Sequence, residues 1–154
     1  MSNNLNSILI EGNLVRDPMF RSTPKGTPLC TFSLASNRYY KQDSQLEREV
    51  SFFNVETWSK LAESCYSQGH KGRGVRVVGR LKQARWTGAD GKAQSRITIV
   101  AEHVEFRPEF KKGAEKPSLE ISEEDEKMAE LENEDLAAQF AAETAKAAKY
   151  EGVF

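Results

Sequence analysis

Apolar and polar residues alternate in several segments of this chain, and this period of two constrains the fold more than any other feature. In the segment LCTFSLAS, Cys30, Phe32 and Leu34 share one face of an extended chain. Thr31 and Ser33 share the other face. Such alternation is typical of a β-strand that buries one side only. The pattern therefore predicts a chain built largely of half-buried strands.

Five segments have this extended character, and one segment between the third and the fourth is different. The predicted strands are SILIEGNLVRDP, LCTFSLAS, VSFFNVETW, VRVVGRLKQARW and SRITIVAEHVEF. The intervening segment, SKLAESCYSQG, has Leu61, Ala62 and Cys65 at helical spacing, which predicts one short helix. Ser59 is expected to cap this helix, and Gly69 follows its end. We therefore predict an all-β, five-stranded Greek-key barrel of the OB-fold type, with one short helix between strands 3 and 4.

Charge divides the chain into a basic body and an acidic tail. Residues 1–112 hold 18 Lys+Arg and 11 Asp+Glu, whereas residues 113–154 hold 4 and 12. We predict an OB-fold domain over residues 5–107, a linker over 108–121 and an acidic, partly helical C-terminal tail over 122–154. A basic body is typical of a protein that binds nucleic acid, although a charged tail also serves to keep a domain in solution.

The tail has the features of a helix. Ser122 is a capping residue, acids fill the first turn, and alanines dominate the second half. Met128, Leu131 and Phe140 form a weak apolar stripe. Two interpretations stay open: a solvated, partly frayed helix, or a helix that docks onto a partner or a neighbouring subunit.

Residues that could perform chemistry are scattered. Cys30 and Cys65 are the only cysteines, and their separation fits two small buried hydrophobes better than a metal site or a disulfide. His70 and His103 have no nucleophile or acid partner at motif spacing. We expect no enzyme, no catalytic residue, no cofactor and no metal. With no transmembrane window and no signal-like N-terminus, we also expect an intracellular, cytoplasmic protein without membrane contact.

A tryptophan near a predicted hairpin stands among cations. The fourth strand leads into GADG, a typical turn sequence, and Trp86 lies close to this turn. Unless a bulge intervenes, alternation places Trp86 on one face with Arg76, Arg80 and Lys82. The residues expected on the inward face of this strand are Val75, Val77, Gly79 and Leu81.

The third strand carries aromatic rings on both faces. Phe52 and Trp58 share a face, and Phe53 lies on the other. Packing of a core does not require aromatics on both sides, so one set is expected to serve binding or assembly. The segment NRYYKQDSQLERE, predicted as a polar loop or hairpin, adds two more rings. Each ring taken alone is also compatible with a place in the core.

Aromatic rings interleaved with cations are what single-stranded nucleic acid requires. Its bases are free to stack on rings, and its phosphates need cations along the path. The cations that we predict to contact phosphate are Lys41, Lys60, Arg73, Arg76, Arg80, Lys82 and Arg85.

Several of these segments resemble the bacterial single-stranded DNA-binding protein family. The motifs are SILIEGNLVRDP, FSLAS, WSKLAE and VVGRLKQARWTGADGK, in the order and spacing of the family, and the resemblance covers about residues 5–107. It implies base stacking on Tyr40, Phe52, Trp58 and Trp86. It also implies a sequence-independent binder of single-stranded DNA in replication, recombination and repair, associated with the nucleoid.

The resemblance implies assembly and partners as well. Members usually form homotetramers, and Phe53 falls where many have a histidine at a subunit interface. The family's acidic C-terminal tip ends in Pro-Phe and recruits replication and repair proteins. This chain ends in KYEGVF, which keeps Phe154 and places Val153 where the proline would stand. We predict these two residues as the partner-binding end, and we expect the acidic tail to compete with DNA for the basic surface.

Two other functions remain as alternatives. Stacking alone does not distinguish ribose from deoxyribose, so an RNA-binding OB module is one alternative. The second is an OB protein whose main work is contact with other proteins.

Overall fold

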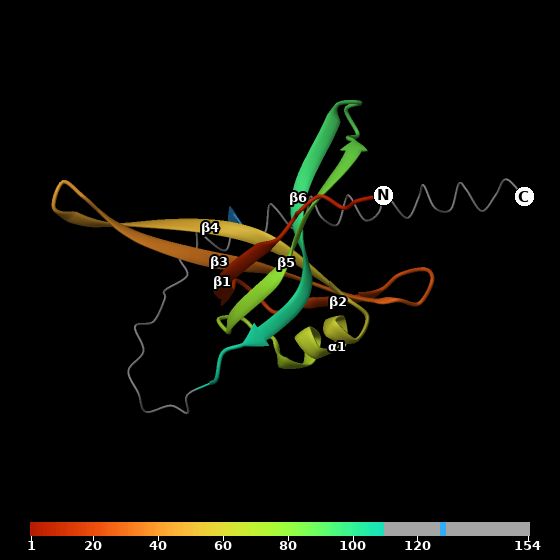
Figure 1. The fold of residues 1–154 in the computed structure, drawn as a ribbon, viewed down its shortest axis with the longest axis horizontal. Coiled ribbons are helices and arrows are strands. Elements are labelled where there is room, and N and C mark those ends of the chain that lie inside the picture. The colour runs from red at the N-terminus through yellow and green to blue at the C-terminus, as the bar shows by residue number, and fades with distance from the viewer. Residues whose placement is uncertain (110–126, 129–154) are drawn as a thin grey trace, which may run out of the picture.

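The computed structural model describes residues 1–109, 127 and 128 of the chain (Figure 1). The elements in chain order are β1 (Ile8–Leu14), β2 (Met19–Ser22), β3 (Pro28–Gln42), β4 (Gln45–Trp58), α1 (Ser59–Gln68), β5 (Gly74–Thr87) and β6 (Ala93–Phe106). Most of the predicted linker and tail, with Val153 and Phe154, lies outside the described residues.

Five strands close into a barrel. The hydrogen-bonded order is β1-β5-β6-β4-β3, and β1 returns to β3 through the pair Leu14↔Leu34. The pair β4–β6 is parallel, at Val55↔Ile99, and the other pairs are antiparallel. β2, which we did not predict, adds to the free side of β3. The one described α-helix follows the third strand of the barrel, and the predicted OB-type architecture is thus confirmed.

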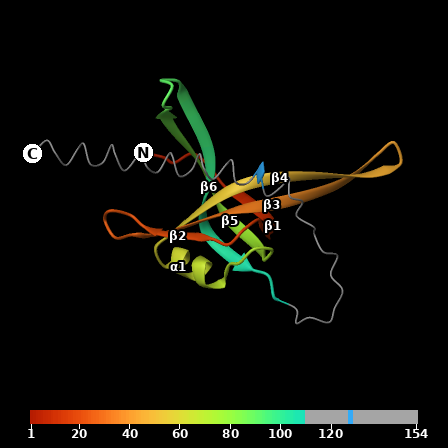
Figure 2. The ribbon, with the colours of Figure 1, turned by 180° about the vertical axis from the view of Figure 1, so that it is seen from behind.

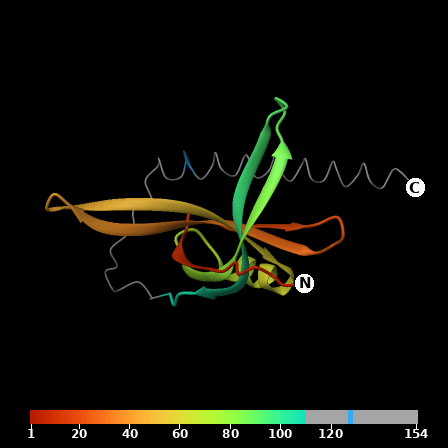
Figure 3. The same cartoon turned by 45° about the horizontal axis from the view of Figure 1, so that its top comes forward.

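Two hairpins extend far beyond the barrel. β3 and β4 pair from Leu29↔Trp58 to Gln42↔Gln45, so the segment predicted as a loop or hairpin continues both strands. The turn at Asp43 and Ser44 has positive φ at both residues, 48° and 67°, as a two-residue type I′ hairpin requires. β5 and β6 form the second hairpin, and the two project in different directions (Figures 1 and 3). We call residues 37–50 the β3–β4 arm and residues 82–98 the β5–β6 arm.

The core is a single apolar cluster inside the barrel. Its buried residues are Ile10, Leu14, Cys30, Phe32, Leu34, Val55, Ala62, Cys65, Val75, Val77, Ile99 and Ala101. α1 lies at one end of the barrel beside β2 (Figure 2) and contributes Ala62 and Cys65. Burial raises the pKa of the Cys30 thiol to about 12 and that of Cys65 to about 11. Both cysteines therefore stay protonated near neutral pH and act as small hydrophobes, as predicted.

Two local predictions were wrong. Ser59 does not cap α1: the N-cap position belongs to Trp58, which makes no side-chain capping bond. The chain passes from β4 into α1 without a linking residue, so the last residue of the strand occupies this position. Leu81, predicted to point into the core, is 42% exposed, because β5 is leaving the barrel there. The side chain of Asn6 bonds both backbone groups of Leu81, at 2.9 Å and 2.7 Å.

A register shift in the β5–β6 ladder depends on a glycine. Val78 pairs with His103 and Gly79 pairs with Ala101, so Glu102 is the extra residue of a β-bulge. A Cβ atom on Gly79 would lie 2.2 Å from the carbonyl oxygen of Val100. The two backbones therefore approach each other as closely as they do only because position 79 has no side chain.

We predict that Gly79→Ala lowers the free energy of unfolding by about 1–3 kcal/mol, because the methyl group overpacks against backbone. Gly74→Ala is the matched control, since Gly74 also lies in β5 and its Cβ position meets only the flexible side chain of Arg107. Denaturant unfolding of both variants checks this. Equal losses of unfolding free energy in the two variants would show that the close backbone approach at Gly79 does not account for the effect.

Candidate nucleic-acid interface

The strand register shows which of the two aromatic faces of β4 points toward the core. Phe53 opposes Leu34, and both pack with the core cluster. Phe52 opposes Ala35 and Trp58 opposes Leu29, so both rings belong to the opposite side of the strand. We call this side the outer face; it consists of the side chains of β3 to β6 that point away from the core cluster. Phe52 and Trp58 are half-buried there, and Phe52 packs beside Ala35.

Trp86 stands on the outer face of the β5–β6 arm, as predicted. Trp86 opposes Gln94, Lys82 opposes Thr98 and Arg80 opposes Val100, and alternation places these pairs on one side of the ribbon. The extra residue of the bulge is in β6, so the alternation along β5 is preserved.

Two arginines of this arm lie on opposite sides of the ribbon, and only Arg85 was among the predicted phosphate contacts. Arg85 opposes Ser95 on the other side of the ribbon, where its guanidinium donates to the Gln83 side-chain oxygen at 3.3 Å. Arg96 opposes Ala84 and shares the face of Trp86. Sequence reasoning missed Arg96, although its alternation with the apolar Ile97 was a usable signal.

The parallel β4–β6 contact joins the two parts of the outer face. Glu56 opposes Val100 there, and Lys82 Nζ donates to Glu56 Oε1 at 3.3 Å. Beside them Ser33 Oγ donates to Asn54 Oδ1 at 2.6 Å in a buried contact. The centre of the outer face thus consists of polar side chains that bond to one another, and Phe52 and Trp58 flank it along β4.

The two tyrosines of the β3–β4 arm lie on opposite sides of that ribbon. Tyr39 opposes Arg48 and shares the side of Phe52, whereas Tyr40 opposes Glu47 and shares the side of Phe53. Only Tyr40 was predicted to stack on bases.

The predicted phosphate-binding cations differ in what they already contact. Within the described residues, Lys41, Lys60 and Arg80 are exposed and form no ion pair. Arg76 instead donates twice to Glu11 Oε2, at 3.0 Å and 3.1 Å. Its charge is therefore paired with a carboxylate at the surface, whereas the other three cations have no such partner among the described residues.

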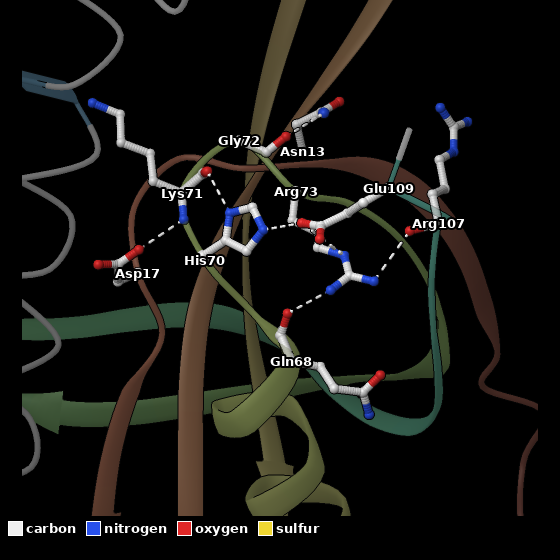
Figure 4. A network of polar contacts seen from close by, with 9 residues as sticks. All are labelled: Asn13, Asp17, Gln68, His70, Lys71, Gly72, Arg73, Arg107 and Glu109. Atoms are coloured by element: carbon white, nitrogen blue, oxygen red, sulfur yellow. Dashed lines mark hydrogen bonds and ion pairs between the residues drawn. The ribbon is translucent and has the colours of Figure 1, made fainter. Parts of the chain in front are cut away.

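Arg73 holds the end of β6 against the end of α1 (Figure 4). Its guanidinium donates to the carbonyl oxygens of Gln68 at 2.9 Å and Arg107 at 3.3 Å. It also lies 5.2 Å from the centre of the Phe106 ring and 3.8 Å from Glu109 Oε1. The side chain is only 17% exposed, so its contacts here are those of a structural residue. Its predicted contact with phosphate stays a prediction.

His70 lies in the same network. Its Nδ1 is 3.0 Å from the Lys71 carbonyl oxygen, and its Nε2 contacts the Glu109 carboxylate. The imidazolium donates to both groups at once, so first the Lys71 carbonyl and then Glu109 raise the pKa of His70. The loop is held from the other side by Asp17, which accepts from the Lys71 amide at 2.8 Å.

We expect this contact to stabilise the fold at low pH. A raised pKa in the folded state gives stability that is complete below the unfolded pKa and is lost as pH rises through the folded value. His70→Ala should therefore lower Tm more at pH 5.5 than at pH 8.5. Thermal unfolding at both pH values tests this, with His103→Ala as the control. A deficit in His70→Ala that does not change with pH would contradict it.

Other kinds of site find no support in the part of the chain that the structure describes. No group of three or more His, Cys, Asp or Glu side chains is placed to hold a metal ion there. No helix among the described residues has the length and apolar character needed to cross a bilayer.

A small Greek-key barrel that carries half-buried rings and exposed cations on its outer face defines an OB-type module for single-stranded nucleic acid. The chain belongs to the single-strand binding protein family, whose model matches residues 5–107.

Curated relatives agree with this assignment. The chain is 37% identical over 123 residues to "Single-stranded DNA-binding protein 2" of Chlorobaculum tepidum, and the aligned segment covers 79% of this chain and 83% of that relative. It is 42% identical over 125 residues to "Single-stranded DNA-binding protein" of Aquifex aeolicus, and this alignment covers 79% of this chain and 80% of that relative.

Proposed function

We propose that this protein binds single-stranded DNA without sequence preference, by stacking bases on aromatic rings and neutralising phosphates with cations. The observation that carries the proposal is the shared outer face of Phe52, Trp58 and Trp86 with Arg80 and Lys82. Each stacked base contributes about 1–3 kcal/mol, and every base has a face that can stack. A row of rings can therefore bind a single strand of any base sequence.

The electrostatic contribution comes from cations that can exchange solvent for phosphate. Arg80 has no ion pair to give up within the described residues. Lys82 keeps 44% of its side chain exposed while its partner Glu56 is 10% exposed, so a phosphate can approach the ammonium group without displacing the carboxylate. Release of counterions from the strand then makes affinity fall steeply with salt.

The geometry favours an unpaired strand over a duplex. Stacked base pairs do not expose their faces, whereas a single strand offers each base to a ring. The names of the two relatives, both single-stranded DNA-binding proteins, favour DNA over RNA. Competition between DNA and RNA oligonucleotides of equal length tests this choice, and preference for RNA would support the alternative module.

The cellular role that we propose is the coating of exposed strands in the nucleoid during replication, recombination and repair. The protein would act without catalysis and as a homotetramer; Phe53, which falls at the family's interface position, packs against the core of its own barrel and is only partly buried there. Val153 and Phe154 are proposed to recruit replication and repair proteins. These proposals rest on the family resemblance.

Removal of residues 113–154 should tighten DNA binding at low salt, if the acidic tail competes with DNA.

Trp86→Ala should weaken binding of a labelled oligo-dT strand by about 1–3 kcal/mol, because one stacking surface is lost. Fluorescence anisotropy measures the affinity. Trp86→Phe, which keeps a ring, is the matched control and should lose less. Thermal unfolding should be unchanged, since Trp86 lies on the arm beyond the barrel. Unchanged affinity of the alanine variant, in a folded protein, would remove Trp86 from the binding path.

Arg80→Ala should reduce the slope of log K against log salt by about 0.7, the value for one contact with a single-strand phosphate. Arg76→Ala provides the comparison, because Arg76 is already bound to Glu11. If Arg76 also contacts phosphate, as the sequence predicts, both substitutions reduce the slope. A slope that Arg80→Ala leaves unaltered would contradict the proposed path over the outer face of β5.

A further inference from the structure

A carboxylate lies in the middle of the cationic outer face. Between Phe52 and Trp58 of β4, and along the β5–β6 arm, Glu56 is the one acid that the register places on this face. Its side chain is only 10% exposed, and the polar side chains of Ser33 and Asn54 beside it are buried as well. A buried acid on a surface that is proposed to attract phosphate calls for a functional explanation.

One of the two oxygens of this carboxylate already has a donor. Lys82 Nζ donates to Glu56 Oε1 at 3.3 Å. Oε2 accepts no hydrogen bond from any of the described residues. An ionised carboxylate has about four lone-pair sites, so Glu56 has capacity for a further donor that the fold itself does not supply. A hydrogen bond to such a charged acceptor is stronger than one between neutral groups.

The nearest aromatic ring on the same strand brings a base within reach of this oxygen. Trp58 is two residues from Glu56 on the same face, about 7 Å along an extended strand. This separation is comparable with the width of a base. A base that stacks on Trp58 can therefore turn its hydrogen-bonding edge toward the carboxylate of Glu56.

The same carboxylate keeps the backbone of the strand away. Two negative groups in contact repel each other, so a phosphate is disfavoured directly over Glu56. Lys82 is 44% exposed and can meet a phosphate on its solvent side while its bond to Glu56 persists. The pair therefore favours one orientation of the strand, with a base over Glu56 and a phosphate beside Lys82.

The four bases differ in what they present to a carboxylate. Cytosine, adenine and guanine each carry an exocyclic amino group, which projects from the ring and donates hydrogen bonds. Thymine has the acceptor O4 where cytosine has its amino group. The N3–H of thymine lies between two carbonyl oxygens, so it cannot approach a carboxylate without bringing an oxygen toward it. Repulsion of that oxygen is the kind of unfavourable contact that produces specificity.

We propose that Glu56 is a specificity-determining residue, whose Oε2 accepts a hydrogen bond from the exocyclic amino group of a base stacked on Trp58. Bases with an amino group are then preferred to thymine at this one position. This role of Glu56 rests on the proposed function and refines it. The other rings still stack on every base, so strands of any sequence bind, with graded affinity.

The variant Glu56→Gln tests this role, because its amide can keep the bond to Lys82 while it no longer repels O4. Fluorescence anisotropy gives the affinities for oligo-dC and oligo-dT of equal length. The ratio of the dC affinity to the dT affinity should fall about 5-fold in the variant. Loss of one negative charge tightens both complexes alike and cancels in this ratio. Glu63→Gln on α1 removes the same charge away from the outer face, and it should leave the ratio unchanged.

A change in the strand tests the same contact on the wild-type protein. A strand of 2-pyrimidinone, which is cytosine without its 4-amino group, should bind about 5-fold more weakly than oligo-dC. This difference should be lost in Glu56→Gln.

Three results would overturn the role of Glu56: a dC to dT ratio that Glu56→Gln does not alter, equal wild-type affinities for the two pyrimidine strands, or a difference between those strands that persists in the variant. A wild-type protein that binds neither oligo-dC nor oligo-dT would instead overturn the proposed function itself.

Discussion

The unbroken antiparallel ladder between β3 and β4 is the constraint on which the arrangement of the binding surface depends. Inside the barrel this ladder places Leu34 and Phe53 in the core. Beyond the barrel the same hydrogen bonds continue to the turn, although no core remains to be packed. Because side chains alternate strictly along a paired strand, the choice of core side in the barrel also decides which side Tyr39 takes on the arm.

Some cationic side chains of this small domain hold the fold together, and others face solvent. Arg73 and Arg76 are held by backbone carbonyls or carboxylates, and they connect strand ends, loops and neighbouring strands of the barrel. Arg80, Lys41 and Arg48 stand where a phosphate can approach them from solvent. An arginine that already has a carboxylate partner gains less from a phosphate, since it must give up or share that partner.

The sequence predicted the larger elements because their patterns are local. Alternation identified the strands and placed Trp86 with Arg80, and helical spacing identified α1. The errors arose where a feature depends on what surrounds it. Ser59 follows directly after a strand and so enters the helix instead of capping it, and Leu81 lies where β5 leaves the barrel. Neither circumstance is visible in a short window of sequence.

The sequence by itself determined which residues within one strand share a side, since the backbone geometry of a strand permits only one alternation. It did not determine which of those sides is buried, because both sides of β4 carry aromatic rings; closure of the barrel decided that Phe53 is inside and Phe52 outside. The tertiary structure also decided the ionic partners. Arg76 meets Glu11, 65 positions away in the chain, and only the pairing of β1 with β5 brings two such distant charges together.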